Sequence, residues 1–211
     1  MTRDAIIFDI DGTLWNVSGA VAKGWGKSLK AFGINTEVSA KDIESVMGHP
    51  TEICIDLLLP GAREKNPGLK NALENCEIEA IKSHGAAFYE GMAEGIRDLA
   101  VSHKIFLVSN CQTSYLRLFL EASGLEPVFS GFDCFGMSGE SKDRMLAKMK
   151  KDHSLKYPVY VGDTVGDEKA AGLAGIDFIH AAYGFGSSKA ATRFGSFPAL
   201  VRSFKKEVLK A

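Results

Sequence analysis

Cysteine is scarce in this sequence, and the few cysteines form no recognisable motif. The four are widely spaced and include no CxxC pair; they are Cys54, Cys76, Cys111 and Cys134. Such spacing is typical neither of a zinc site nor of a disulfide framework. We therefore expect reduced thiols and a cytoplasmic location.

Long apolar runs and an excess of one charge are also missing. No apolar segment approaches the roughly 18 residues that a membrane-spanning helix requires, and aspartates interrupt the short N-terminal apolar run, unlike in a signal peptide. Lys and Arg number 25 and Asp and Glu 26, for a net charge of -1. We therefore expect neither nucleic acid nor a membrane as a partner.

The composition is that of a globular protein with a substantial core. Of the 211 residues, 45% are hydrophobic and 24% charged. This length suits one domain of moderate size, or a core with a smaller insert. We expect a monomer or a weak homodimer.

Five short segments are predicted to be buried strands, and they lie at 5–10, 104–110, 132–136, 157–163 and 177–183. The first, second and fourth are nearly continuous apolar runs, which are typical of strands covered on both faces. Helical patterns alternate with the strands after residue 90. This order predicts an α/β fold with a doubly wound parallel sheet.

Residues 17 to about 84 differ, because they contain no convincing strand and several amphipathic helical patterns. Ser39 is a predicted N-cap, and Gly48 and Gly85 are predicted helix stops. Two interpretations are open. The segment is either an elaborated crossover or a helical cap that stands over the carboxyl end of the first strand.

Acidic motifs lie at the carboxyl ends of two of the predicted strands. Asp9 and Asp11 lie in "DIDGT", and Asp163 and Asp167 lie in "GDTVGD". Ligands of open α/β sheets bind beyond the carboxyl ends of the strands, so all four carboxylates are expected at one cleft. Carboxylates this close repel one another, and a hard divalent cation with oxygen ligands, Mg²⁺, is the partner that fits best.

Neutral donors and one cation complete this predicted site. Thr13 offers a hydroxyl and a backbone N–H, Ser109 and Asn110 lie at the end of another strand, and Lys142 starts a predicted helix. A metal ion, a lysine and several donors are what a phosphoryl group requires. The sequence therefore predicts a site that binds a phosphoryl group.

Two aspartates can divide the chemistry of phosphoryl transfer. Asp9 is expected to be ionised at neutral pH and to attack phosphorus as a nucleophile. Asp11 would give a proton to the leaving oxygen and later accept one from water. These roles require a pKa for Asp11 above that of Asp9.

The motifs resemble those of the haloacid dehalogenase (HAD) superfamily. "DIDGTLW" is similar to its first motif, "LVSN" to its second, Lys142 to its third and "VGDTVGDEKAA" to its fourth. The insert resembles the C1 cap of phosphoglycolate-phosphatase-like members. The resemblance implies a core of residues 1–15 and 86–211 and an all-helical cap of residues 16–85.

The resemblance also implies a Rossmann-like sheet with strand order 5-4-1-2-3 and a set of residue roles. Mg²⁺ would be bound by the Asp9 side chain, the Asp11 backbone carbonyl and Asp163. Asp167 would assist the metal, Asp9 would form an aspartyl-phosphate, and Lys142 would balance the charge. Ser109 would hold a phosphate oxygen, with Asn110 in support.

The sequence departs from many relatives at two places. Lys142 is followed by Asp143 rather than proline, which leaves Lys148 as an alternative third-motif lysine. After "DGTL", Trp15 and Asn16 stand where many phosphatases of this group have an acidic residue. Both departures lie beside groups that are predicted to meet the substrate.

The cap loop "MGHPTE" (47–52) matches by order a loop that selects the substrate in C1-capped relatives. His49 would then contact the leaving group; the other interpretation is an ordinary helix–helix turn with an exposed histidine. Three classes of function stay open: a Mg²⁺-dependent phosphatase, which we favour, a phosphomutase of the β-phosphoglucomutase type, and a non-enzymatic phospho-acceptor module.

Overall fold

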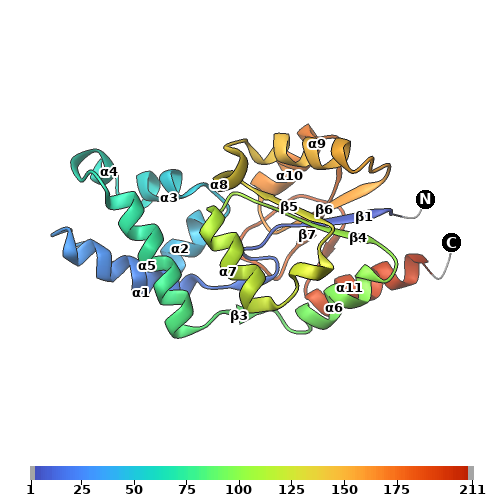
Figure 1. The fold of residues 1–211 in the computed structure, drawn as a ribbon, viewed down its shortest axis with the longest axis horizontal. Helices are drawn as coiled ribbons and strands as arrows, with labels where there is room; N and C mark the ends of the chain where they lie inside the picture. The colour runs from blue at the N-terminus through green and yellow to red at the C-terminus, as the bar shows by residue number, and fades with distance from the viewer. Residues whose placement is uncertain (1–2, 209–211) are drawn as a thin grey trace.

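The core of the molecule is a six-stranded parallel sheet between two layers of helices (Figure 1). The computed structural model describes residues 3–208. The strand order is β5-β4-β1-β6-β7-β8. The strands are β1 (Ala5–Phe8), β4 (Lys104–Ser109), β5 (Gly131–Cys134), β6 (Pro158–Gly162), β7 (Asp177–Ala181) and β8 (Arg193–Phe194).

The five predicted strands are all present and lie in the predicted order, so the predicted α/β class is confirmed. The difference in detail is β8, an unpredicted sixth strand that pairs with β7 through only two residues. Each predicted strand also ends one or two residues early. The polar residues that follow the apolar runs already belong to the loops that build the site.

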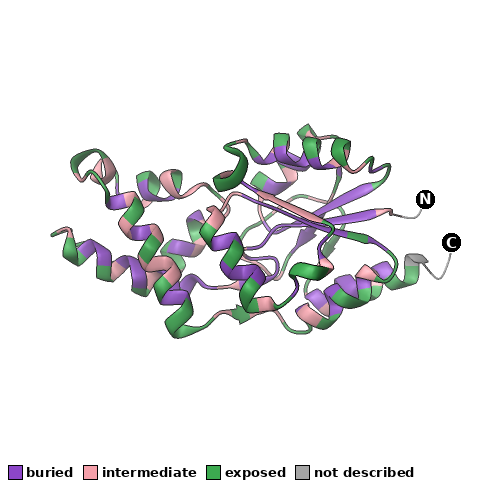
Figure 2. Ribbon diagram, in the orientation of Figure 1, coloured by how far each residue is buried: buried purple, intermediate pink, exposed green. Residues whose placement is uncertain are grey.

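Helices cover both faces of the sheet because its strands are apolar on both sides. One face packs on α9 (Lys142–Asp152) and α10 (Val165–Leu173), and Figure 2 shows the strands buried between the layers. The other face packs on α6 (Met92–Ala100), α7 (Thr113–Ser123) and α11 (Phe197–Val208). Two short helices, η1 (Glu126–Val128) and α8 (Phe135–Ser138), flank β5.

The chain between β1 and α6 forms a helical module. It extends from the carboxyl side of the sheet (Figure 1). Its helices are α1 (Ser18–Ala31), α2 (Ala40–Val46), α3 (Thr51–Leu58), α4 (Ala62–Lys65) and α5 (Leu69–His84). Gly24 lets α1 pack closely on α5, since a Cβ there would lie 2.5 Å from the Cys76 carbonyl oxygen.

The predicted N-cap and helix stops of this module are confirmed. Ser39 caps α2 in a capping box with Asp42, which satisfies two backbone N–H groups at the helix start. Gly85 ends α5, and Gly48 follows α2 with φ +96°. The sequence did not predict the two-stranded antiparallel pair of β2 (Trp15–Asn16) and β3 (Ala87–Phe88), through which the chain leaves and re-enters the core.

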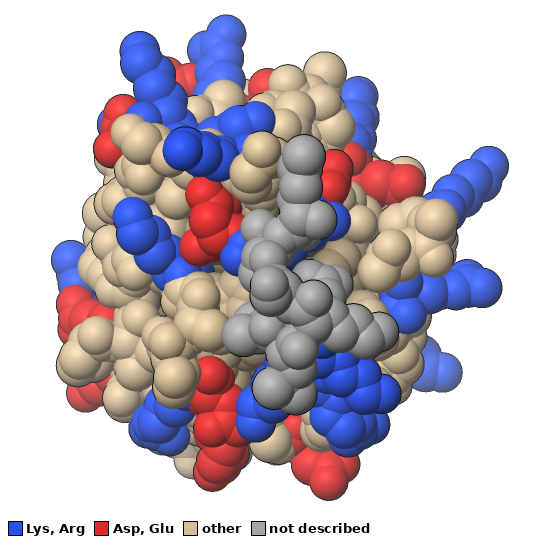
Figure 3. Space-filling model, turned by 90° about the vertical axis from the view of Figure 1, so that its right-hand side faces the viewer, with Lys and Arg blue, Asp and Glu red and all other residues tan. Residues whose placement is uncertain are grey.

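The described surface carries mixed charge. On the end of the core away from the helical module, Lys and Arg side chains are interspersed with Asp and Glu (Figure 3). The four cysteines are free thiols. Among the helices of residues 3–208, none has the length and apolar character that crossing a bilayer requires.

Candidate active site

Three aspartates converge beyond the carboxyl ends of β1 and β6. Asp9 follows β1, Asp163 follows β6, and Asp167 lies in the first turn of α10. Each is 1% exposed, and one carboxylate oxygen from each lies within 4.8 Å of the others. The topology thus joins two motifs that are more than 150 positions apart, because their strands are neighbours in the sheet.

The local sequence of the fourth motif fixes Asp167. Thr164 caps α10, and its backbone N–H and hydroxyl both donate to Oδ2 of Asp167, at 3.0 and 2.7 Å. Oδ1 is thereby left to face the cluster. Gly162 permits this close approach, since a Cβ there would lie 2.7 Å from Cγ of Asp167.

Lys142 is the cation at this cluster. It starts α9, is 6% exposed, and its ammonium lies 2.6 Å from Oδ1 of Asp167 and 3.2 Å from Oδ2 of Asp9. Burial opposes the charged form, but the two carboxylates outweigh it and raise the pKa of Lys142 above its ordinary value. Lys148, the alternative third-motif lysine, is exposed and pairs with Asp152 instead.

The ionisation of Asp9 and Asp167 is set by burial and by Lys142. Burial raises the pKa of Asp9 to about 8; Lys142 opposes the shift, and the neighbouring aspartates add to it. Burial also favours the neutral form of Asp167. For Asp167, however, the charge of Lys142 and the hydrogen bonds from Lys142 and Thr164 outweigh burial, so the pKa of Asp167 lies below its ordinary value.

The acidic cluster fits a hard divalent cation. Within the described residues, neither carboxylate oxygen of Asp9 has an aligned hydrogen-bond donor, although both are buried. A buried carboxylate without donors is costly, and Asp9 shares the ammonium of Lys142 with Asp167. All the potential ligands are oxygens, the donor set that Mg²⁺ prefers. A metal ion bound by Asp9 and Asp163, with Asp167 beside them, would satisfy these groups.

The loop after β7 holds Asp163 in place, and the sequence did not predict this role. The backbone N–H groups of Phe185 and Gly186 donate to Oδ2 of Asp163, at 2.8 and 3.1 Å. The Tyr183 hydroxyl donates to the Thr13 carbonyl at 2.9 Å. The glycine-rich "YGFG" sequence was a possible signal, since backbone can approach a site closely where side chains are missing.

Burial raises the pKa of Asp163 to about 7, with the charge of Asp167 adding to the shift and the two N–H groups of the loop opposing it. The first-motif loop also lies against this carboxylate. Gly12 adopts φ +70°, and a Cβ there would lie 2.2 Å from Oδ2 of Asp163. The hydroxyl of Thr13 is buried without a hydrogen-bond partner among the described residues. It is thus free to bind a ligand.

Asp11 faces away from the three-aspartate cluster and is held by two aromatic residues. The Tyr115 hydroxyl donates to its Oδ1, and so does Nε1 of Trp15, at 3.0 Å. Burial raises the pKa of Asp11 to about 6, and these two hydrogen bonds limit the rise. The predicted order of pKa values is therefore wrong for the metal-free protein, because Asp9 is more strongly desolvated and lies among more carboxylates.

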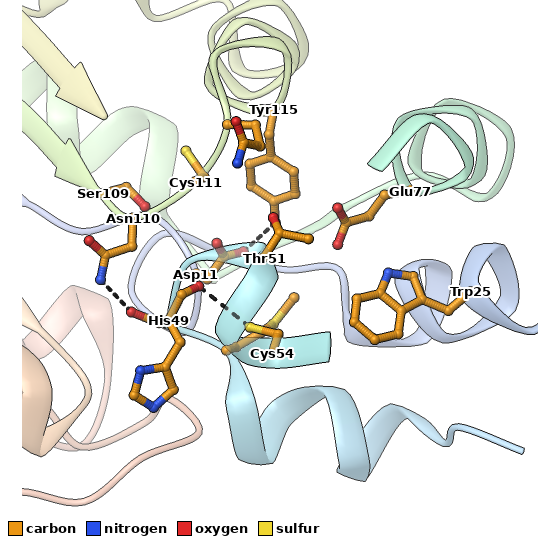
Figure 4. A pocket seen from close by; sticks show the side chains of 13 residues that line it. Asp11, Trp25, His49, Thr51, Cys54, Glu77, Ser109, Asn110, Cys111 and Tyr115 are labelled. Atoms are coloured by element: carbon orange, nitrogen blue, oxygen red, sulfur yellow. Dashed lines mark hydrogen bonds between the residues drawn. The ribbon is translucent and has the colours of Figure 1, made fainter. Parts of the chain in front are cut away.

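A cavity of about 50 Å³ lies between Asp11 and the helical module. The predicted residues Ser109, Asn110 and His49 line it, and Figure 4 shows them with Asp11. The Asn110 amide donates to the Gly48 carbonyl at 2.7 Å, so it ties the module to the core. His49 is exposed, and its ring points away from Asp11 in this view.

These four motifs and their geometry agree with a comparison against protein families. Residues 6–181 match the model of the haloacid dehalogenase-like hydrolases. The chain belongs to this family. The predicted family and the predicted enzyme class, a hydrolase of the HAD superfamily, are thereby confirmed.

Known HAD-like proteins are similar over nearly the whole chain. A phosphoglycolate phosphatase of Colwellia psychrerythraea is 21% identical over 206 residues, which cover 92% of this chain and 90% of that protein. A solved HAD-like hydrolase from Streptococcus pneumoniae matches with a TM-score of 0.77 at 19% identity, covering 96% of this chain and 98% of that one. A structure from Haemophilus somnus, titled a predicted phosphoglycolate phosphatase, has a TM-score of 0.80 at 19% identity and the same coverage. At these identities the solved structures show a shared fold.

Proposed function

We propose that this HAD-like hydrolase is a Mg²⁺-dependent phosphatase that acts on a small phosphorylated metabolite. The observation that supports this most is the surroundings of Asp9. Its carboxylate is buried and without an aligned hydrogen-bond donor, 3.2 Å from the Lys142 ammonium and within the three-aspartate cluster. Such a group is available to a metal ion and to phosphorus at the same time.

Asp9 is the nucleophile of the proposed mechanism. One carboxylate oxygen attacks phosphorus, the bond from phosphorus to the leaving oxygen breaks, and an aspartyl-phosphate forms on Asp9. Lys142, Ser109 and Thr13 bind the phosphoryl oxygens. Mg²⁺ would supply further positive charge for those oxygens.

Asp11 is the proposed general acid and base. In its protonated form it gives a proton to the leaving oxygen, so that a neutral alcohol departs. The resulting carboxylate then takes a proton from the water that attacks the phosphorus of the aspartyl-phosphate. Inorganic phosphate is released, and Asp9 is regenerated. A pKa of about 6 gives Asp11 access to both forms near neutral pH.

Entry of a substrate requires the helical module to move. The cavity beside Asp11 has room for only a few water molecules. The hydrogen bond from Asn110 to Gly48 spans the boundary between core and module, and it has to break when the module opens. We propose that residues 16–85 act as a cap that closes over a bound substrate and excludes bulk water.

Phosphate release tests this proposal. The protein is assayed with a panel of phosphorylated metabolites and para-nitrophenyl phosphate, with Mg²⁺ and with EDTA. Mg²⁺-dependent release of phosphate supports a phosphatase. Conversion of a sugar phosphate to its isomer without phosphate release would instead identify a phosphomutase. Phosphorylation of Asp9 without turnover would identify a phospho-acceptor module. The cytoplasmic location and the monomer or weak homodimer stay predictions.

A further inference from the structure

Two residues of the helical module form the far wall of the cavity, opposite Asp11. Glu77 comes from α5 and Trp25 from α1, and Figure 4 shows the two side chains next to each other. Neither has a part in the chemistry proposed above. Both line the same cavity as Asp11, the group proposed to give its proton to the leaving oxygen.

The indole nitrogen of Trp25 is an unused donor. Trp25 is 2% exposed, and within the described residues its Nε1 is buried without a hydrogen-bond partner. A buried N–H without an acceptor destabilises the folded protein, and such groups are rare in native structures. The indole lies beside Glu77 but forms no aligned hydrogen bond with it. An acceptor atom in the cavity would satisfy this group.

The wall around Trp25 is acidic. Glu77 and Asp11 both line the cavity, and none of the lining residues, all of which lie in the described chain, is a lysine or an arginine. Burial raises the pKa of Glu77 to about 8; the charges of Asp11 and Glu74 add to the shift, and the nearby indole N–H of Trp25 opposes it. The cavity thus offers carboxyl acceptors and an N–H donor but no fixed positive charge.

We propose that Glu77 and Trp25 determine specificity by binding a hydroxyl group on the leaving alcohol of the substrate. This inference rests on the proposed phosphatase function and deepens it. A hydroxyl donates one hydrogen bond to the carboxyl of Glu77 and accepts one from Nε1 of Trp25. It is therefore the group that satisfies both residues at once.

Other leaving groups satisfy these residues less well. A carboxylate accepts from Trp25 but cannot donate to Glu77, and its charge would be buried in a cavity whose wall holds no lysine or arginine to pair with it. An ammonium donates to Glu77 but cannot accept from Trp25, and a methyl group satisfies neither. The preferred substrate is then a phosphate monoester of a small polyol, and a carboxylate ester such as phosphoglycolate is disfavoured.

A matched series of substrates tests the inference. We would measure kcat/KM for two- to four-carbon phosphate monoesters that end in hydroxyl, methyl, ammonium or carboxylate, with para-nitrophenyl phosphate as a check on the chemistry. The variants are Glu77→Leu, which removes the acceptor, and Trp25→Phe, which keeps the ring and removes the donor. Glu79→Leu, at an exposed position of the same helix, is the control.

The hydroxyl esters should be the best substrates, by at least about tenfold over the carboxylate esters. Each test variant should lower the ratio of hydroxyl to methyl esters about tenfold, whereas the control should leave it unchanged. A merely structural role would slow both esters alike, so an unchanged ratio in both test variants overturns the inference. If one variant fails to fold, the other gives the same readout.

The remaining outcomes separate this inference from the proposed function. A preference for carboxylate or ammonium esters overturns the role of Glu77 and Trp25 and leaves the phosphatase intact. Equal rates across the series, with good release from para-nitrophenyl phosphate, do the same. No release from any ester, the aryl phosphate included, overturns the proposed function and this inference with it.

Discussion

The hydroxyl of Tyr115 donates a hydrogen bond to Oδ1 of Asp11, although the two residues lie 104 positions apart in the chain. Tyr115 belongs to α7, and its ring packs edge-on against Trp15, which donates to the same oxygen. The orientation of the proposed acid and base therefore depends on a helix outside the four motifs. The two hydrogen bonds also hold Oδ1 of Asp11, so Oδ2 is the oxygen that would carry the proton in the proposed reaction.

Tyr115→Phe should shift the pH dependence of the reaction upward. The lost hydrogen bond stabilises the charged form of Asp11, so its loss raises the pKa of Asp11 above about 6. Because Asp11 has to be protonated to give its proton, kcat/KM for an alkyl phosphate falls as pH rises through this pKa. We expect the falling limb to move up by about one pH unit.

The same variant contains its own control. para-Nitrophenol is a good leaving group that needs no proton, so the limb for para-nitrophenyl phosphate should not move. Tyr157→Phe, which alters an exposed tyrosine, should leave both profiles unchanged. An unshifted limb for the alkyl phosphate in Tyr115→Phe would show that this hydrogen bond does not set the pKa of Asp11.

Lys142→Gln should destabilise the protein, and most strongly without metal. The substitution removes the cation beside Asp167 and Asp9 and leaves buried carboxylates uncompensated, which costs about 3–5 kcal/mol of unfolding free energy. Urea unfolding in EDTA measures this loss, and Mg²⁺ should reduce it. Lys148→Gln on the same helix is the matched control, and a change within about 0.5 kcal/mol is expected there.

Substitution of the two aspartates of the first motif should separate the two chemical steps. Asp9→Asn should abolish turnover, because the nucleophile is lost. Asp11→Asn should still become phosphorylated by para-nitrophenyl phosphate, but hydrolysis should slow by about 10²–10⁴-fold. Mass spectrometry of acid-quenched protein detects the phosphoryl group. Asp152→Asn, at an exposed site, should behave as the wild type; full activity in Asp9→Asn would disprove the mechanism.

Gly184→Ala should weaken metal binding by displacing the loop that holds Asp163. A Cβ at Gly184 would lie 2.2 Å from the Gly12 carbonyl oxygen and 2.4 Å from Cβ of Asp163. We expect activity to require about 10–100-fold more Mg²⁺. In a Mg²⁺ titration of the rate, Gly195→Ala should match the wild type, since a Cβ there meets nothing within 4 Å. Equal Mg²⁺ dependence in both variants would contradict this role of the loop.

The sequence could predict the parts of the site that lie at strand ends. Asp9 and Asp163 follow apolar runs that are recognisable as buried strands, and parallel pairing of those strands puts both residues at one edge. Lys142 could be identified as a candidate cation because it begins the predicted helix of the third motif. These predictions depended on the apolar pattern of the strands and on the order of strands and helices along the chain.

The rest of the site depends on contacts between segments with no local signal. The N–H groups of Phe185 and Gly186 reach Asp163 only because β7 pairs with β6, and a backbone donor has no side chain to mark it in the sequence. Trp25 and Glu77 meet because α1 packs on α5. A tryptophan at helical spacing is predicted to be core, and its free nitrogen becomes evident only in the folded protein.

The two short strands β2 and β3 have a consequence for how this protein could change. Asn16 and Ala87 are register partners, so the chain departs from the core and returns to it at one place. Residues 17–86 could be replaced as a single cassette without displacing Asn16 or Ala87. Because these two residues are paired, a short turn could also connect them directly. The residues that we propose to bind phosphate and metal lie outside that cassette. Replacing the helical module could therefore change the substrate while the core residues proposed for the chemistry stay the same.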